Sequence, residues 1–179
     1  MPAGFMITKK KNLTLYHGST CKVDVPRLVG SNRYKDFGRG FYLTSDKVQA
    51  SDFARDRVDR DGGVPWLNLY KLESFEGLSV LEFPEANRDW FEFILQARVG
   101  RISWCKADVV IGKVADDGTY KVFKKFESGV YSEAADMIPG VTAIDLAVKA
   151  LKTDALKNQL CFRTEKALRA LRFSKAFRL

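Results

Sequence analysis

The sequence has very few of the residues that bind metals or form disulfide bonds. Its 179 residues include one histidine, His17, and three cysteines, Cys21, Cys105 and Cys161. The cysteines are odd in number, far apart and without a CxxC spacing, so neither a disulfide framework nor a thiolate zinc site is expected. A single histidine excludes every motif that needs two histidine ligands. We therefore expect no metal site and three buried, unreactive thiols.

Long hydrophobic runs are also missing. No apolar stretch approaches the ~20 residues of a membrane-spanning helix, and no apolar segment precedes the lysines near the N-terminus as it would in a secretory signal. We therefore expect a cytoplasmic protein without a membrane partner. Hydrophobic residues make up 46% of the chain and charged residues 29%, which is the composition of a folded globular domain. The length suits one such domain.

Positive charge is concentrated towards the C-terminus. The whole chain carries a net charge of +8, and the segment from Lys149 onwards, with nine basic and two acidic residues, carries +7. Six basic residues recur at every third position: Arg163, Lys166, Arg169, Arg172, Lys175 and Arg178. Such a segment attracts polyanions, nucleic acid above all, or it is a solvated helical face. Charge alone leaves both interpretations open.

Apolar periodicity predicts an α+β domain of short strands and helices in no regular order. We expect a disordered leader over 1–12, a single domain over 13–171 and a basic tail over 172–179. The expected strands are 13–16, 41–43, 64–72, 78–83, 107–114 and 159–162. The expected helices are 46–60, 85–99, 142–152 and a last helix, capped by Thr164, that carries the basic repeat; 119–127 fits either a helix or a strand. Residues 18–40 form a long loop of the kind that usually carries function.

Three short patterns stand out within this organisation. YHGS (16–19) places His17 at the end of a strand, followed by a glycine that permits close approach of a ligand. FGRGFYLTSDKVQASDF (37–53) is a glycine-rich loop, an aromatic strand and a capped helix. NQLCF (158–162), as a strand, places Gln159 and Cys161 on one face and Leu160 and Phe162 on the other. Each pattern alone also has a purely structural explanation.

Together the three patterns resemble the ADP-ribosyltransferase superfamily, in its poly(ADP-ribose) polymerase-like or diphtheria-toxin-like branch. His17 matches the histidine of the family's HG motif, and Tyr42 matches the tyrosine of its GxYF segment. Gln159 takes the place of the family's glutamate. The chain also resembles a group of small bacterial proteins of this superfamily that share DFGRGFYLT and a closing QxCFxTEKAL; this likeness extends from about Leu13 to Leu171.

The resemblance implies two small packed antiparallel sheets with surrounding helices and an NAD-binding cleft. His17, Tyr42 and Gln159 would be the catalytic residues. His17 would donate a hydrogen bond to the adenosine-side ribose, Tyr42 would stack on the nicotinamide ring, and Phe53 would cover its opposite face.

The remaining NAD contacts implied by the resemblance come from two short backbone segments. The Gly18 backbone would pair with the nicotinamide amide, with Ser19 beside it. Gly38, Arg39 and Gly40 would approach the diphosphate. The family has a hydroxyl residue where this chain has Ala50, and the adjacent Ser51 is the candidate to replace it.

The implied activity is NAD-dependent mono-ADP-ribosyl transfer that releases nicotinamide through an oxocarbenium-like transition state. The acceptor would be a nucleic acid, because the basic segment follows Gln159, or a protein. The small bacterial relatives imply a toxin held in check by an antitoxin protein. Gln159 carries no negative charge and cannot act as a base, which argues against chain elongation.

Other functions remain open. Gln159 stands where the family has a glutamate. This replacement favours a non-enzymatic module of the same fold that binds NAD, ADP-ribose or a partner. RNA 2′-phosphotransferases share the fold but use further histidines, which this chain lacks. A nonspecific nucleic-acid-binding protein is the interpretation that charge alone supports.

Overall fold

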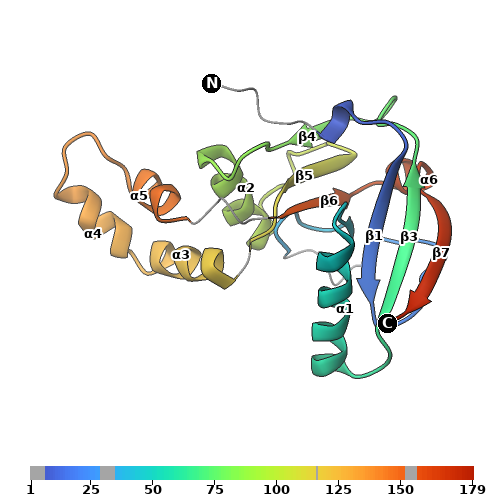
Figure 1. Cartoon of the computed structure of the whole chain (residues 1–179). Coiled ribbons are helices and arrows are strands. Elements are labelled where there is room, and N and C mark those ends of the chain that lie inside the picture. Colours follow the sequence, from blue (N-terminus) through green and yellow to red (C-terminus); the bar gives the residue numbers. More distant parts are fainter. Residues whose placement is uncertain (1–6, 29–34, 116, 152–156) are drawn as a thin grey trace.

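Two small sheets and the helices around them form the domain, which confirms the α+β class (Figure 1). The computed structural model describes residues 7–28, 35–115, 117–151 and 157–179. The three-stranded antiparallel sheet has the order β1 (Leu13–Ser19), β3 (Trp66–Leu72), β7 (Arg172–Arg178). The four-stranded sheet has the order β2 (Phe41–Leu43), β6 (Asn158–Phe162), β5 (Val109–Lys113), β4 (Val80–Glu82).

The four-stranded sheet is mixed, not antiparallel as expected, because β4 and β5 pair in parallel. Helix α2 (Arg88–Arg98) lies between these two strands in the chain. A helical crossover returns the chain to the same end of the sheet, so the second strand runs parallel to the first. The other two pairs of this sheet, β2 with β6 and β5 with β6, are antiparallel.

The C-terminal segment departs most from expectation. Thr164 caps a helix as predicted, but α6 spans only Glu165–Arg169, and the predicted long basic helix is wrong. Arg172–Arg178, expected as a tail, is strand β7, which pairs with β3 along the edge of its sheet. Phe173 packs edge-on against Tyr70 of β3, with 5.8 Å between ring centroids. The local sequence favours a helix for this segment, but pairing with β3 and packing of the Phe173 ring favour a strand.

The N-terminal segment also belongs partly to the folded domain. Residues 1–6 lie outside the described residues, but Ile7–Lys9 forms a 3-10 helix. Ile7 is buried, and its N–H donates to Glu82 Oε1 at 2.6 Å. Asn12 N–H donates to the Glu73 carbonyl at 2.8 Å. The expectation of a disordered leader is therefore wrong for residues 7–12.

The core has two main parts, one on each face of the four-stranded sheet. Cys161 of β6 faces a cluster with α2, whereas Leu160 and Phe162 face a cluster shared with the three-stranded sheet. This confirms the alternation predicted for NQLCF. The outer face of β1 and β3 is covered by helix α1 (Lys47–Asp61), through contacts that include Ala50, Leu67 and Leu69.

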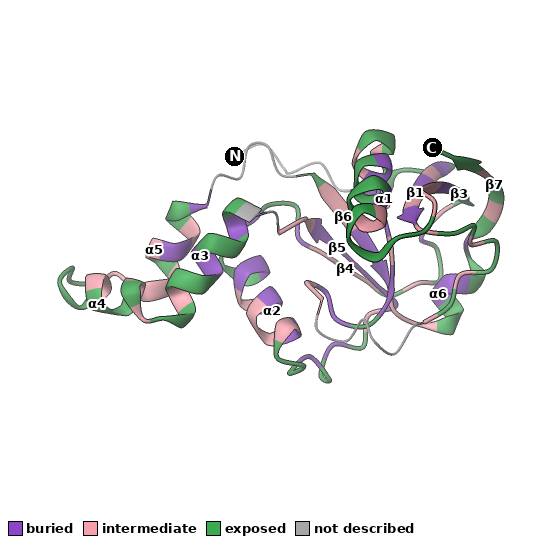
Figure 2. Ribbon diagram, turned by 90° about the horizontal axis from the view of Figure 1, so that it is seen from below, coloured by how far each residue is buried: buried purple, intermediate pink, exposed green. Residues whose placement is uncertain are grey.

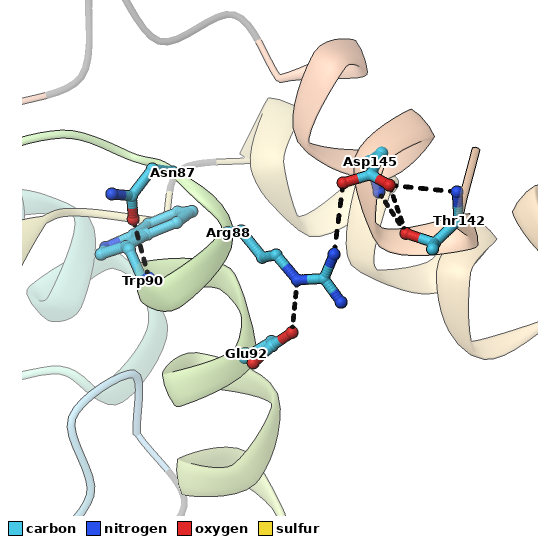
Figure 3. A network of polar contacts seen from close by, with 6 residues as sticks. All are labelled: Asn87, Arg88, Trp90, Glu92, Thr142 and Asp145. Carbon is cyan, nitrogen blue, oxygen red and sulfur yellow. Dashed lines mark hydrogen bonds and ion pairs between the residues drawn. The ribbon is translucent and has the colours of Figure 1, made fainter. Parts of the chain in front are cut away.

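Three helices form an arm that extends away from the sheets (Figures 1 and 2). They are α3 (Asp117–Glu127), α4 (Val130–Asp136) and α5 (Ala143–Ala150). The segment 119–127 is therefore helical. Arg88 joins the arm to α2, since it bonds Glu92 of its own helix at 2.9 Å and Asp145 of α5 at 3.4 Å (Figure 3). Stacking of Phe91 on Phe123, with 4.4 Å between centroids, fixes α3 against α2.

Candidate functional site

A cleft of about 900 Å³ lies where β1, β2 and β6 meet helix α1. It brings together seven of the nine residues that the sequence predicted for a site: His17, Gly18, Ser19, Gly40, Tyr42, Phe53 and Gln159. Strand pairing explains the convergence. Tyr16 of β1 and Thr44 after β2 exchange backbone hydrogen bonds of 2.8 and 3.0 Å, and Tyr42 of β2 pairs with Cys161 of β6.

His17 is a neutral imidazole with a defined tautomer. Its strand continues to Ser19, so the ring stands inside β1 and not at its end as expected. Nδ1 lies 2.7 Å from the Tyr42 carbonyl, which only accepts, so the proton is on Nδ1 and Nε2 remains an acceptor. Burial, with smaller contributions from the nearby Arg57 and Lys35 charges, outweighs the hydrogen bond to Tyr42 and lowers the pKa of His17 to about 4. Towards a ribose hydroxyl this ring therefore accepts a hydrogen bond and does not donate one as expected.

Gly18 is required by the packing of helix α1. A Cβ there would lie 2.0 Å from the Ala50 carbonyl oxygen, so β1 and α1 approach each other through the space that a side chain would fill. Its backbone has a second property. Alternate residues of a strand direct their N–H and C=O groups to the same side, and Tyr16 directs its groups towards Thr44. The Gly18 groups therefore point away from β3, on the cleft side of β1.

Ser19 lines the cleft, but its hydroxyl shapes the turn that follows β1. It donates to the Cys21 carbonyl and accepts from Asn68 Nδ2 at 3.0 Å. Asn68 is fully buried, and its Oδ1 accepts from Val23 N–H at 2.8 Å. Sequence reasoning missed Asn68; the signal was a single amide in the apolar strand WLNLYKL. This network holds the loop that forms one wall of the cleft.

Tyr42 lines the cleft with its ring, because its hydroxyl is hydrogen-bonded to the backbone of the preceding loop. The hydroxyl donates to the Gly38 carbonyl at 2.6 Å and accepts from Phe37 N–H at 3.1 Å. Burial raises the pKa of the phenol well above its usual value. The Lys35 ammonium lies 5.9 Å from the ring centroids of both Tyr42 and Phe53. The two aromatic rings thus already share a cation in the cleft.

The glycine-rich loop does not form the predicted anion site. Among the described residues that line the cleft, Gly38 and Arg39 are absent. Arg39 is exposed and donates to the Leu28 carbonyl at 3.3 Å. At Gly40 a Cβ would lie 2.3 Å from Cys161 Sγ, so this glycine serves the packing of β2 on β6.

Other cations line the cleft instead: Arg27, Lys35, Arg57 and Lys157. These four residues come from separate segments of the chain, so no local sequence motif predicted that they would line one cleft. The cleft also holds the carboxylates of Asp36, Asp52 and Asp56. Of the basic residues from Lys149 onwards, Lys157 lines the cleft. The six that recur from Arg163 to Arg178 are absent from its described lining, which ends at Gln159 in chain order.

Gln159 lies against a carboxylate that sequence reasoning did not assign. Its Nε2 donates to Asp36 Oδ2 at 3.1 Å. Asp36 is held in turn by Arg98, whose Nη2 lies 2.8 Å from Oδ1. The one signal in the sequence was the position of Asp36 at the start of DFGRGFYLT. The neutral Gln159 is therefore accompanied by a negative charge in the cleft.

Two smaller expectations are also corrected. Ser51 does not replace the family's hydroxyl, because its Oγ donates to the Lys47 carbonyl at 2.9 Å, whereas Ala50 lines the cleft. Cys105 and Cys161 are buried, but Cys21 is exposed and lines the cleft. The prediction of three buried thiols is wrong for Cys21, because it follows β1 on a surface loop.

Within the described ranges, no three His, Cys, Asp or Glu side chains cluster in a way that could hold a metal ion. Over the same ranges, no helix has the length and apolar character needed to cross a membrane.

Residues 13–173 match a family described as "Protein of unknown function (DUF3990)", and the chain belongs to this family. The match covers the four-stranded sheet, strands β1 and β3 and every described residue that lines the cleft, and it ends within β7. No curated protein and no solved structure matches the chain.

Proposed function

We propose that this protein is an NAD-dependent mono-ADP-ribosyltransferase of the ADP-ribosyltransferase fold, and that the cleft binds NAD. One observation carries the proposal: His17, Tyr42 and Gln159 line a single cleft although 25 and 117 residues separate them in the chain. The resemblance assigned these three residues to one site. A volume of about 900 Å³ suits a ligand of dinucleotide size.

The aromatic pair suits the nicotinamide end of NAD. The ring centroids of Tyr42 and Phe53 both lie 5.9 Å from one ammonium group, that of Lys35. Aromatic faces attract cations, and the nicotinamide ring of NAD is a planar cation. Binding of that ring would displace the Lys35 ammonium towards the diphosphate, where a second cation, Arg57, also lines the cleft.

The backbone of Gly18 supplies the hydrogen-bonding groups that a carboxamide needs. Its N–H and C=O lie on one side of β1, directed away from β3. A carboxamide presents one acceptor and two donors in the same plane, so it pairs with these two groups as another strand would. This contact would fix the nicotinamide ring against Tyr42.

The chemistry requires cleavage of the bond between the ribose C1′ and the nicotinamide nitrogen. The bonding electron pair leaves with nicotinamide, which becomes neutral, and positive charge develops on the ribose. An acceptor nucleophile then bonds to C1′ and loses its proton. The carbonyl oxygen of Gln159 stabilises this charge and orients the hydroxyls of that ribose, whereas the imidazole of His17 accepts from the adenosine-side ribose. The acceptor molecule, nucleic acid or protein, and an antitoxin partner stay predictions from the resemblance.

A second function, binding of NAD or ADP-ribose without catalysis, is favoured by the neutral state of His17, Tyr42 and Gln159. Burial keeps His17 uncharged, the Tyr42 hydroxyl is engaged with the loop, and Gln159 has no ionisable group. A module of this kind would bind NAD or ADP-ribose and leave the glycosidic bond intact.

The test is to measure NAD binding by calorimetry and nicotinamide release by the purified protein and two variants. Tyr42→Ala and Gln159→Ala should abolish release, and Tyr42→Ala should also weaken binding about tenfold or more. Gln96→Ala is the matched control, because Gln96 bonds Trp104 outside the cleft. Binding without release would favour the binding module. Absence of NAD binding by the folded wild-type protein would overturn the transferase, and absence of ADP-ribose binding as well would overturn the binding module.

A further inference from the structure

We propose that Asp36 is a positioning residue that holds the Gln159 carboxamide with Nε2 towards itself and Oε1 towards a ligand hydroxyl. The inference rests on the proposed function, since the hydroxyl is that of the ribose bound in the cleft. Both residues line the cleft. A carboxylate only accepts hydrogen bonds, so the 3.1 Å contact with Asp36 Oδ2 defines which end of the amide is the nitrogen.

The Asp36 carboxylate is itself fixed by several donors from different elements. Arg98 of α2 donates to Oδ1 from Nε at 3.2 Å and from Nη2 at 2.8 Å. Ala115 N–H, after β5, donates to Oδ2 at 3.2 Å beside the Gln159 amide. The Asp36 and Arg98 side chains are only 16% and 21% exposed, so water screens this pair weakly. Such charge-assisted bonds hold the carboxylate in one orientation.

Arg98 extends the network to the helical arm. Its guanidinium carbon lies 4.5 Å from the ring centroid of Phe123 and 5.9 Å from that of Tyr120, both in α3. Stacking of this kind limits the rotation of the guanidinium. The orientation of Gln159 is therefore set from outside the cleft, through Asp36 and Arg98, by the packing of α3 on α2.

The orientation matters because a carboxamide can rotate by 180° with almost no change of shape. With Oε1 in the cleft, the amide accepts from a ribose hydroxyl and places partial negative charge beside the ribose. With Nε2 in the cleft, it would place partial positive charge where the oxocarbenium character develops. Asp36 excludes the second orientation, and its effect is larger on the transition state than on the bound substrate.

The experiment compares NAD with an analogue that lacks the 2′-hydroxyl of the nicotinamide ribose, using calorimetry on the purified protein. Wild-type protein should bind NAD about tenfold more tightly than the analogue, and Gln159→Ala should lose this preference. Asp36→Asn should lose it as well, with release of nicotinamide slowed about tenfold to a hundredfold where release occurs. A merely structural role would weaken binding of both dinucleotides equally.

Glu127→Gln is the matched control, because Glu127 is a carboxylate outside the described lining of the cleft and pairs with Lys124 on the exposed surface of α3. It should keep the full preference for NAD. Arg98→Lys is a second variant that retains the positive charge but loses the two-point contact with Asp36. It should reduce the preference for NAD over the analogue several-fold.

The outcomes separate the two proposals. No NAD binding by wild-type protein would overturn the proposed function, and this inference with it. A preference that disappears in Gln159→Ala but survives in Asp36→Asn and Arg98→Lys would overturn the positioning role alone. Because the Arg98→Lys protein keeps both buried charges, its result stands even if Asp36→Asn fails to fold.

Discussion

His17 and Tyr42 are joined by a 2.7 Å hydrogen bond from the imidazole Nδ1–H to the tyrosine main-chain carbonyl. The bond connects β1 of one sheet to β2 of the other at the floor of the cleft. It also determines the chemistry of the histidine, because a ring that donates from Nδ1 while neutral can only accept at Nε2. The Phe41 ring, with its centroid 4.4 Å from that of His17, adds to the burial that keeps the imidazole neutral.

Acid should destabilise the protein through His17. Its pKa is about 4 in the folded state against 6.5 for an ordinary histidine, so between these values the unfolded state binds the additional proton. The resulting stabilisation is complete above pH 6.5 and is lost as the pH falls towards 4, by as much as about 3 kcal/mol. The free energy of unfolding, measured by urea denaturation at pH 4.5 and at pH 7, gives the size of this loss. His17→Asn retains a donor for the Tyr42 carbonyl and should lose less stability over this interval; an equal loss in both proteins would contradict the assignment.

Thiol labelling should distinguish Cys21 from the other cysteines. Cys21 is exposed, whereas Cys161 is fully buried and its burial raises the pKa of the thiol to about 12. The folded protein should therefore react with one equivalent of a disulfide reagent within minutes, and with three only after unfolding. Cys21→Ser should abolish the fast reaction. Because Cys21 lines the cleft, saturating NAD should slow its labelling; rapid labelling of a second thiol in folded protein would contradict the described packing.

Removal of the Lys35 charge should strengthen binding of a cationic nicotinamide. The ammonium lies 5.9 Å from the ring centroids of both Tyr42 and Phe53, so it competes for both aromatic faces and repels another cation. Lys35→Ala should bind the N-methylnicotinamide cation about threefold to tenfold more tightly than wild-type protein. This probe has no phosphate, so Lys35 cannot assist its binding.

The control for this prediction is Lys22→Ala. Lys22 also lies over an aromatic ring, 5.5 Å from the Phe173 centroid, but it is not among the described residues that line the cleft. Its removal should leave binding of the probe unchanged. Unchanged or weaker binding by Lys35→Ala would show that the two rings do not form the nicotinamide site.

Deletion of residues 172–179 should unfold the protein, because the segment is a strand and not a tail. It pairs with β3 over most of that strand and covers Tyr70 with Phe173. The triple variant Arg172→Gln, Lys175→Gln, Arg178→Gln should remain folded, with a change in unfolding free energy below about 1 kcal/mol. The one ion pair that these residues form within the described ranges, Arg172 with Glu73, is highly exposed.

The same triple variant tests the basic strand as a nucleic-acid contact. Binding of a short single-stranded RNA should weaken, and the slope of log affinity against log salt should fall by about 2. Equal binding and an equal slope would remove the nucleic-acid interpretation of the C-terminal charge. A native circular-dichroism spectrum in the deletion variant would contradict the pairing of β7 with β3.

Local signals in the sequence predicted much of the fold. The alternation in NQLCF placed Leu160 and Phe162 on one core face and Cys161 on the other, and the caps at Asp46 and Thr164 began helices as expected. The parallel pairing of β4 with β5 and the strand at Arg172–Arg178 were not predictable in this way. Each depends on which distant strand is available at a sheet edge, and no local pattern contains that information.

For the candidate site, the sequence alone determined the residue types and their order along the chain. The resemblance of His17, Tyr42 and Gln159 to a family's motif depends on that order. Only the tertiary structure brought Asp36 to Gln159, placed the Lys35 ammonium near the Tyr42 and Phe53 rings, and left Arg39 outside the described lining of the cleft. It also decided that His17 donates from Nδ1 to the Tyr42 carbonyl, which leaves Nε2 as an acceptor, and that Gly18 serves the contact with Ala50. The physical reason is that charge, protonation and steric fit depend on neighbours, and in this fold most of those neighbours are remote in the chain.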